Sequence, residues 1–361
     1  MIISKAVPKI GFIVNPIAGL GGKVALKGTD GMEKRAIQLG GKPVAPYRAK
    51  EFLKALDGKF KLYTCSSPMG GNIVQECKIP THVIYHCKKP TTFQDTKNAA
   101  KLMKNLDLLI FVGGDGTARD IIDAVDMDIP ILGVPSGVKM YSAVFAMTPY
   151  EAALVTKRFL QGLPVVEKEV LDIDEDAFRK DTLKVSLKGY ALVPDDDTIQ
   201  ESKNFLEEGE EDKVAIAKGV IDMLNGLTIM GGGSTTYALK KLVGINGTLL
   251  GVDILKDKKL IAKDATENEI LKHLKSNQKA KIIISPMGGQ GFIFGRGNEQ
   301  ISPEVIKRVG VDNIIILSTP NKVRGLPGLR VDTGNRQLDK ELSGYHTVYT
   351  GVKRKKVMKI L

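Results

Sequence analysis

A short glycine-rich segment contains the residues whose types and spacing best suit chemistry. Gly113-Gly114-Asp115-Gly116-Thr117 follows an apolar run and precedes apolar residues at helical spacing. The glycines let phosphate oxygens approach backbone amides, and the positive end of a helix dipole attracts their charge. A carboxylate among these amides repels phosphate unless it holds Mg²⁺ or accepts a hydroxyl proton. The segment therefore predicts a phosphate site in which Asp115 carries the chemistry; the alternative is a tight strand-to-helix turn with Asp115 as a cap.

The elements that must position this segment alternate between strand and helix. Short β-rich apolar runs predict five strands, at Lys9–Asn15, Lys59–Thr64, His82–Cys87, Asp107–Val112 and Pro130–Val134. Apolar residues at helical spacing between the third and fourth runs, and again after the fourth, predict helices that cover the sheet. Thr148-Pro149-Tyr150-Glu151 combines an N-cap, a proline at the first helical position and a glutamate three residues after the cap, so it begins another helix. The alternation predicts a doubly wound parallel sheet, in which ligands bind at the carboxyl edge of the strands.

The pattern changes after this part of the chain. Apolar and polar residues alternate from Leu183 to Lys188, as expected for a strand with one solvent-exposed face. The length of 361 residues fits about two domains. We therefore expect the fold class α/β plus β-rich, with an α/β nucleotide-phosphate-binding domain over residues 1–165, a β-rich second domain over 166–280, and a segment over 281–361 that returns to the first domain.

Composition restricts the function classes. Lys and Arg number 53 against 41 Asp and Glu, a formal net charge of +12, which suits an anionic ligand without identifying it. An aromatic content of 6% without tryptophan offers little stacking surface, so we expect no nucleic-acid partner. Three cysteines without a CxxC pair exclude a disulfide framework and indicate a cytoplasmic protein. No apolar run reaches 18 residues, so we expect no membrane partner.

The sequence does not match two other nucleotide-binding motifs. Gly19–Lys23 reads GLGGK, but a Walker A loop needs glycine where Ile17 stands and serine or threonine where Val24 stands. No GxGxxG with a downstream acidic residue follows the first predicted strand, so a hydride-transferring dehydrogenase is unsupported.

Three segments carry a family resemblance, and a fourth, Leu132–Gly137, lies where the same family places its next ligand loop. Gly113–Thr117 matches the GGDGT signature shared by NAD kinases, diacylglycerol and sphingosine kinases and, in variant form, phosphofructokinases. Gly11–Gly22, which reads GFIVNPIAGLGG, resembles the first strand and Asn-Pro loop of this superfamily, and Gly233–Ala238 resembles the GSTAY segment of NAD kinases. Over most of residues 9–320 the chain thus resembles the ATP-NAD kinase-like family, the ATP- or polyphosphate-dependent NAD kinases related to acetoin-catabolism protein X.

The resemblance implies Mg²⁺-dependent phosphoryl transfer from ATP, or from polyphosphate, to the 2′-hydroxyl of NAD, giving NADP. It implies that Asp115 is the catalytic base. The implied nucleotide-phosphate site comprises Asn15, Gly113, Gly114, Gly116 and Thr117. The implied acceptor site, mostly in the second domain, comprises Ser136, Gly233, Ser234, Thr235 and Tyr237. The phosphates themselves are expected to carry the Mg²⁺, with no protein metal ligand, and the implied partners are NAD and ATP in a homodimer or tetramer.

Two glycine-rich segments leave alternatives open. The segment 23–31, which includes Thr29 and Asp30, suits either a phosphate or ribose loop or an ordinary glycine-rich loop. The run 286–298 either approaches a ligand or forms a hairpin turn, and its Arg296 would suit a phosphate clamp.

The identity of the acceptor is also open. Typical NAD kinases carry an Asn-Glu or Asn-Asp pair at the start of a second-domain strand, and Lys188-Gly189-Tyr190-Ala191 lacks it. The acceptor can therefore be NAD, NADH or another hydroxyl compound. The alternative functions are a diacylglycerol, other lipid or small-molecule kinase, and a non-catalytic nucleotide-binding regulatory protein.

Overall fold

The computed structural model describes residues 6–26, 31–137, 140–174, 177, 180–182, 184–201, 209–275 and 279–361. The chain divides into two compact units. The first unit comprises Met1–Leu20, Lys42–Asp174 and Lys184–Ser202, and the second comprises Gly21–Gly41, Glu175–Leu183 and Lys203–Leu361.

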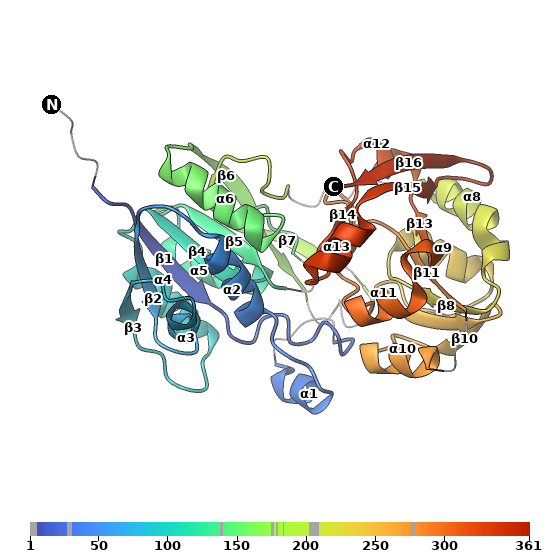
Figure 1. Cartoon of the computed structure of the whole chain (residues 1–361), viewed down its shortest axis with the longest axis horizontal. Coiled ribbons are helices and arrows are strands. Elements are labelled where there is room, and N and C mark those ends of the chain that lie inside the picture. The colour runs from blue at the N-terminus through green and yellow to red at the C-terminus, as the bar shows by residue number, and fades with distance from the viewer. Residues whose placement is uncertain are drawn as a thin grey trace. The chain divides into compact units, whose positions relative to one another are not determined.

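A five-stranded parallel sheet forms the centre of the first unit (Figure 1). Its strands are β1 (Lys9–Val14), β2 (Lys61–Cys65), β3 (Thr81–Tyr85), β4 (Leu108–Gly113) and β5 (Ile131–Pro135). All five predicted strands are confirmed, with ends that differ from the prediction by no more than two residues. The order is β3-β2-β1-β4-β5, so the chain runs outward from β1 in one direction and then outward from β4 in the other. The carboxyl ends of β1 and β4 therefore form a topological switch point, where open α/β sheets bind ligands.

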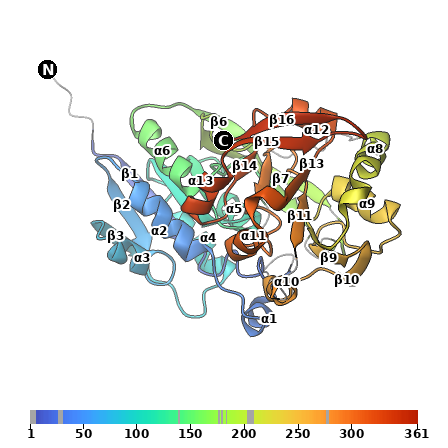
Figure 2. The same ribbon diagram turned by 45° about the vertical axis from the view of Figure 1, so that its right-hand side comes forward.

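Helices cover both faces of this sheet, as expected for a doubly wound fold. They are α2 (Ala45–Ala55), α3 (Gly71–Glu76), α4 (Phe93–Leu102), α5 (Asp115–Val125) and α6 (Pro149–Leu160). Helices α2 and α6 pack together on one face, and α4 and α5 pack together on the other (Figures 1 and 2). The helix start at Thr148 is confirmed, because the Thr148 Oγ1 accepts a hydrogen bond from the Glu151 amide at 3.1 Å and Pro149 is the first helical residue.

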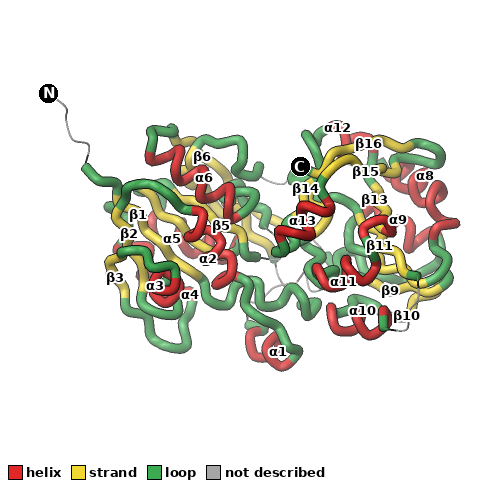
Figure 3. Tube along the Cα trace, in the orientation of Figure 1, coloured by secondary structure: helices red, strands yellow, loops and turns green. Residues whose placement is uncertain are grey.

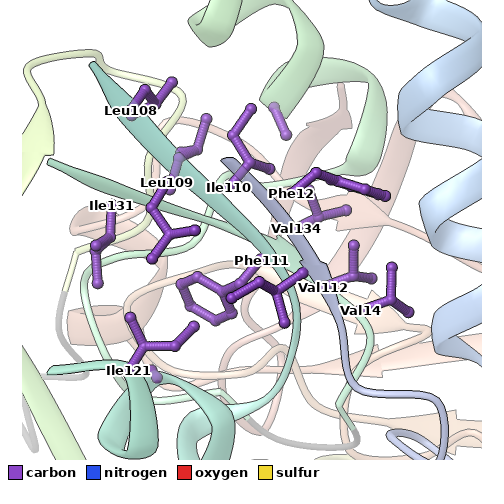
Figure 4. Close-up of a cluster of buried hydrophobic side chains, with 14 of the residues drawn as sticks. Phe12, Val14, Leu108, Leu109, Ile110, Phe111, Val112, Ile121, Ile131 and Val134 are labelled. Carbon is purple, nitrogen blue, oxygen red and sulfur yellow. The ribbon is translucent and has the colours of Figure 1, made fainter. Parts of the chain in front are cut away.

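The core of the first unit anchors the strand that leads to the glycine-rich segment. Every residue of β4 is buried, because helices cover the sheet on both sides. Figure 4 shows that β4 has apolar side chains on both sides: Phe111 lies toward Ile121 of α5, and Phe12 of β1 and Val134 of β5 lie on the other side of the sheet. Full burial of one large apolar side chain stabilises a fold by roughly 1.5–3 kcal/mol, so this packing holds the carboxyl end of β4 firmly in place.

An antiparallel hairpin of β6 (Val165–Ile173) and β7 (Val185–Pro194) also belongs to the first unit. Its buried face, which includes Val170, Ala191 and Val193, joins the core of the parallel sheet. The division of the chain therefore differs from the expected three parts, because the hairpin that begins the expected second domain packs on the first unit.

The second unit is built on a seven-stranded mixed sheet of order β10-β9-β8-β11-β13-β15-β16. Four neighbouring strands are parallel, namely β8 (Leu227–Met230), β11 (Ala280–Ile284), β13 (Ile314–Leu317) and β15 (Gly344–Tyr349). Antiparallel strands β9 (Asp253–Lys256), β10 (Lys259–Ala262) and β16 (Lys355–Ile360) flank them, and β12 (Phe292–Phe294) pairs with β14 (Arg330–Val331). A β-rich second domain is confirmed. Residues 281–361 complete its sheet, because β11 pairs with β8, so they do not return to the first unit.

Helices surround the second sheet (Figure 3). They are α8 (Glu210–Val220), α9 (Ser234–Leu242), α10 (Glu267–Leu274), α11 (Pro303–Val309), α12 (Pro320–Arg324) and α13 (Arg336–Leu342), with the 3₁₀ turns η1 (Ile221–Met223) and η2 (Val311–Asn313). The short helix α1 (Glu33–Gln38) also belongs to this unit. Along β11, Ile283 packs with α8 and α9, whereas Ile282 and Ile284 pack with α10, α11 and α13. In the described parts of the chain, no helix has both the length and the apolar character needed to cross a membrane.

Candidate functional site

The switch point of the first unit brings three sequence-predicted segments together. Asn15 follows β1, Gly113–Thr117 ends β4 and begins α5, and Ser136 follows β5. The Asn15 amide donates to the Val112 carbonyl at 2.9 Å, and the Ser136 amide donates to the Gly113 carbonyl at 3.1 Å. The hydrogen-bonded sheet edge therefore sets the spacing of these residues.

The first glycine of the segment makes room for a polar contact. Asn15 Nδ2 donates to Thr117 Oγ1 at 3.0 Å. A Cβ atom added to Gly113 would lie 2.4 Å from that same Oγ1, whereas one added to Gly114 would meet only Gly137 Cα, at 3.5 Å. Only a residue without a side chain at 113 leaves the contact between Asn15 and Thr117 intact.

The amino end of α5 suits an anion. Gly114 is the N-cap and no side chain caps the helix, so the first-turn amides of this 11-residue helix are open to a ligand. Nearby, Ser136 is 4% exposed, and its Oγ has no hydrogen-bond partner among the described residues. A buried hydroxyl without a partner costs about 1–3 kcal/mol, which a phosphate oxygen would offset. The glycine turn, the open amides and the Ser136 hydroxyl fit a bound phosphate.

Asp115 is buried and held by backbone amides. Its Oδ2 accepts from the Tyr141 amide at 2.7 Å, and its Oδ1 accepts from the Ser142 amide at 3.0 Å. The side chain is turned toward this loop and does not cap α5. Each carboxylate oxygen can accept two hydrogen bonds, so both keep capacity for a substrate hydroxyl.

Burial of Asp115 changes its acidity. Removal from water raises the pKa of this carboxyl to about 6, against the lowering effect of the Ser142 hydroxyl and of the Ser142 and Tyr141 amides. A carboxylate with this pKa is ionised at neutral pH and is a stronger base than an ordinary aspartate.

In the part of the chain that is described, no cluster of metal-ligating side chains lies at the site. That part contains no group of three or more His, Cys, Asp or Glu side chains able to hold a metal ion. Mg²⁺ takes oxygen ligands, which phosphate groups bound at this turn would supply.

A second glycine turn lies in the second unit, where residues 231–233 connect β8 to α9. Gly233 has a φ of +128°, which favours glycine, and its amide donates to the Leu249 carbonyl at 2.7 Å. A Cβ atom on Gly232 would lie 2.6 Å from the Leu250 carbonyl oxygen. The turn thus packs directly against the backbone of residues 249–250.

The start of α9 gathers the remaining predicted acceptor residues. Ser234 and Tyr237 are half-buried, and the Lys241 ammonium lies 4.8 Å from the centre of the Tyr237 ring. Thr235 is fully buried, yet its Oγ1 has no hydrogen-bond partner among the described residues. The same is true of Ser285 Oγ, which follows β11, the strand next to β8. Two unpartnered hydroxyl groups therefore sit at the carboxyl edge of this parallel sheet.

A buried ion pair holds the backbone behind this turn. Lys240 and Asp253 are both fully buried, and Lys240 Nζ lies 2.8 Å from Asp253 Oδ2. Burial lowers the pKa of the Lys240 ammonium, and the Asp253 carboxylate opposes this effect. Lys240 Nζ also donates to the Thr248 carbonyl at 2.8 Å, and the Thr248 amide donates to Asp253 at 2.7 Å. The pair therefore fixes Thr248, directly before the residues that contact Gly232 and Gly233.

The other sequence candidates lie elsewhere. Thr29 and Asp30 lie outside the described residues. Arg296 is 4% exposed, its guanidinium lies 4.6 Å from the centre of the Phe292 ring, and its Nε lies 3.8 Å from Asp332 Oδ2, so its contacts are within the second unit. Residues 188–191 lie on β7 of the first unit.

Sequence reasoning missed the groups that hold the predicted residues. The amides of Tyr141 and Ser142 have no sequence signal, because any non-proline residue supplies an amide. Lys240 is one of many lysines, and only its complete burial beside Asp253 distinguishes it.

Comparison with known families covers most of the chain. The model of the ATP-NAD kinase N-terminal domain matches residues 10–163. The model of the ATP-NAD kinase C-terminal domain matches residues 224–360. No curated protein matches the chain.

The geometry at Gly113 predicts a stability difference within one turn. Gly113→Ala should lower the free energy of unfolding by about 1–3 kcal/mol, because the new methyl group must displace Thr117. Gly114→Ala is the matched control and should change it by less than about 0.5 kcal/mol, because its backbone angles and surroundings accept a methyl group. Urea unfolding of the three proteins measures both values. Equal destabilisation by the two variants would contradict the assignment.

The buried ion pair predicts a contrast between adjacent lysines. Lys240→Met should destabilise the second unit by about 3–5 kcal/mol, because it leaves the buried Asp253 charge without its partner. The exposed Lys241 provides the control, and Lys241→Met should have an effect below about 1 kcal/mol. Thermal and urea unfolding test this contrast, and a Lys240→Met protein as stable as the control would show that the pair contributes nothing.

Proposed function

The chain belongs to the ATP-NAD kinase family, and from that membership we propose that it transfers a phosphoryl group from ATP, or from polyphosphate, to the 2′-hydroxyl of NAD, giving NADP. The observation that carries this proposal is the buried Asp115 carboxylate, held by two amides beside a glycine turn at the switch point of a parallel sheet. An anion site and a base next to each other are what transfer of a phosphoryl group to a hydroxyl requires.

The donor phosphates would bind at the first unit. Asn15 and Thr117 would supply side-chain hydrogen bonds, and the amides of Gly114 and Gly116 lie at the amino end of α5. Ser136, which the resemblance assigns to the acceptor, lies beside the same turn, and we propose that its unpartnered hydroxyl binds a phosphate oxygen instead. When bound on the phosphates, Mg²⁺ neutralises part of their charge. These residues would keep the transferring group aligned, which is the main requirement of a reaction with a loose transition state.

Asp115 would take the proton of the acceptor. The hydroxyl of the acceptor donates a hydrogen bond to the carboxylate, and the hydroxyl oxygen forms a bond to phosphorus as the bond from phosphorus to the leaving phosphate oxygen breaks. The proton passes to Asp115 late in this transfer, because a loose transition state develops little charge on the attacking oxygen. The Tyr141 and Ser142 amides hold the carboxylate in one orientation throughout.

The acceptor would bind through the second unit. Gly233, Ser234, Thr235 and Tyr237 surround the start of α9, and the unpartnered Thr235 and Ser285 hydroxyls can pair with polar groups of a dinucleotide. The three free cysteines of the chain support a reducing cytoplasm as its location, and we propose a homodimer or tetramer on the family resemblance alone.

Replacement of the base tests the reaction directly. Purified protein with Mg²⁺, ATP and NAD should form NADP, measured with an NADP-specific dehydrogenase, and Asp115→Asn should lower kcat by at least about 100-fold, the lower end of the range for loss of a general base. The asparagine variant should keep its circular dichroism spectrum, since its one carbonyl oxygen still accepts an amide. Retained turnover would remove Asp115 from the mechanism.

The same assay also tests whether NAD is the acceptor. If the wild-type protein binds ATP but forms no NADP, the acceptor is another hydroxyl compound, and lipid and polyol acceptors become the next substrates to assay. ATP binding without transfer to any acceptor would favour a regulatory nucleotide-binding protein.

The raised pKa of Asp115 predicts the pH dependence. Protonation below about pH 6 removes the base, so kcat/KM should rise as pH rises through about 6 and level off above it. An ordinary aspartate would place this transition near pH 4. Stopped assays from pH 4.5 to 8, with circular dichroism at each pH to verify folding, measure the profile. A profile that is flat down to pH 4.5 would contradict the role of a buried Asp115.

A further inference from the structure

Gln200 is a fully buried polar residue in the segment that follows β7, which ends at Pro194, and none of the proposed chemistry uses it. We infer that Gln200 is a positioning residue for Asp115, because its side-chain amide holds the backbone of residues 140–142 so that two amide N–H groups point at the Asp115 carboxylate. Its effect on turnover rests on the proposed function, whereas its effect on the Asp115 carboxylate does not. Gln200 lies outside both family-matched regions, 10–163 and 224–360.

Two hydrogen bonds connect Gln200 to this backbone. Gln200 Nε2 donates to the Ser142 carbonyl at 2.6 Å and to the Met140 carbonyl at 3.3 Å. The Gln200 backbone amide donates to the Phe145 carbonyl at 2.8 Å, which fixes the position of its own side chain.

Peptide geometry transmits these contacts to Asp115. The Met140 carbonyl and the Tyr141 amide belong to one peptide unit, whose C=O and N–H point in opposite directions when the bond is trans. Gln200 holds the C=O of this unit, and its N–H donates to Asp115 Oδ2 at 2.7 Å. Gln200 therefore fixes the rotation of the peptide plane that aims the N–H at the carboxylate.

Ser142 provides the second connection. Its carbonyl accepts from Gln200, while its amide donates to Asp115 Oδ1 at 3.0 Å. Its hydroxyl accepts from the Leu171 amide at 3.0 Å and donates to the Leu171 carbonyl at 3.2 Å, so β6 holds the loop from another direction. The contact with Met140 thus acts on the peptide unit whose N–H binds Asp115 Oδ2, and the contact with Ser142 holds the peptide unit directly after the one whose N–H binds Oδ1.

The chemistry of Gln200 also favours this role over simple packing. Its Oε1 is buried without a hydrogen-bond partner among the described residues, which is unfavourable. An apolar side chain of similar volume would fill the same space without that cost. The two donated hydrogen bonds are what glutamine adds at this position.

Few charged groups near Asp115 affect the pKa of its carboxyl. On β6, Asp172 raises the pKa of Asp115 but is paired with Arg119 of α5 at 3.2 Å. On α4 and β7, Lys97 and Lys188 pair with Asp123 of α5 at 2.9 and 3.7 Å. The Tyr141 phenol is also near, and burial raises its pKa, so it stays neutral. Burial, the Ser142 hydroxyl and the two amide bonds therefore dominate the pKa of Asp115.

Gln200→Met tests the inference, because methionine is also unbranched, has a similar volume and donates no hydrogen bond. The carboxyl titration of Asp115 is followed by NMR with ¹³C-labelled aspartate, and its signal is the one absent from Asp115→Asn. Without the aimed amides the charged form loses stabilisation, so the titration midpoint should move from about 6 to a value about 0.5–1 unit higher. The acid limb of kcat/KM should shift by the same amount, with kcat lowered about tenfold.

Thr156→Val is the matched control. Thr156 is also fully buried in the first unit, and its hydroxyl donates to the Ala152 carbonyl at 2.8 Å within α6. This variant loses one buried hydrogen bond but should leave the Asp115 titration unchanged.

The possible outcomes separate the two proposals. A folded Gln200→Met protein whose Asp115 midpoint is unchanged would overturn the inference. If that variant does not unfold cooperatively, Gln200→Leu repeats the measurement, and failure of both to fold would show a structural role only. If the wild-type protein forms no NADP, the proposed function fails, and the NMR titration still decides the role of Gln200.

Discussion

Burial of the Asp115 carboxylate is the constraint on which the rest of the first unit depends. A charged group 5% exposed is stable only where hydrogen bonds replace its water, and here two backbone amides do so. Those amides belong to a loop whose later residues, Val144 and Ala146, hydrogen-bond to Gly133 of β5. The β6–β7 hairpin and Gln200 hold the residues next to Asp115, which gives a physical reason for the hairpin to pack on the first unit.

Both units contain a glycine turn that connects a buried parallel strand to a helix. In the first unit, Gly113 is required because Thr117 occupies the space of its Cβ atom. In the second unit, Gly232 lies against a backbone carbonyl, and Gly233 has a positive φ. Close packing around the turn thus prevents side chains and leaves backbone amides at the sheet edge. The buried pair of Lys240 and Asp253 fixes the backbone behind the second turn, as Gln200 fixes the loop beside Asp115.

Local patterns predicted the elements well where local physics decides them. Thr148 and Pro149 begin α6 as expected, because an N-cap hydroxyl and a proline act within one helical turn. Strands β1, β4 and β5 were predictable because both faces of the sheet are buried there, which requires continuous apolar runs. The division into units was less predictable. Alternation near Val185 indicates a strand with one exposed face but not which core its other face joins, and β11 pairs with β8 through long-range contacts that leave no local signal.

The sequence by itself predicted a phosphate site at the glycine turn after β4, because glycine, aspartate and threonine at that spacing after a buried strand favour anion binding. It also determined the strand–helix alternation and, through the GGDGT and GSTTY segments, the family. Only the tertiary structure decided how Asp115 is held, that Ser136 and Thr235 lack partners, and that Lys240 and Gln200 are buried. The physical reason is that these features depend on backbone groups and on burial. Every residue type carries the same backbone groups, and burial is set by segments distant in the chain.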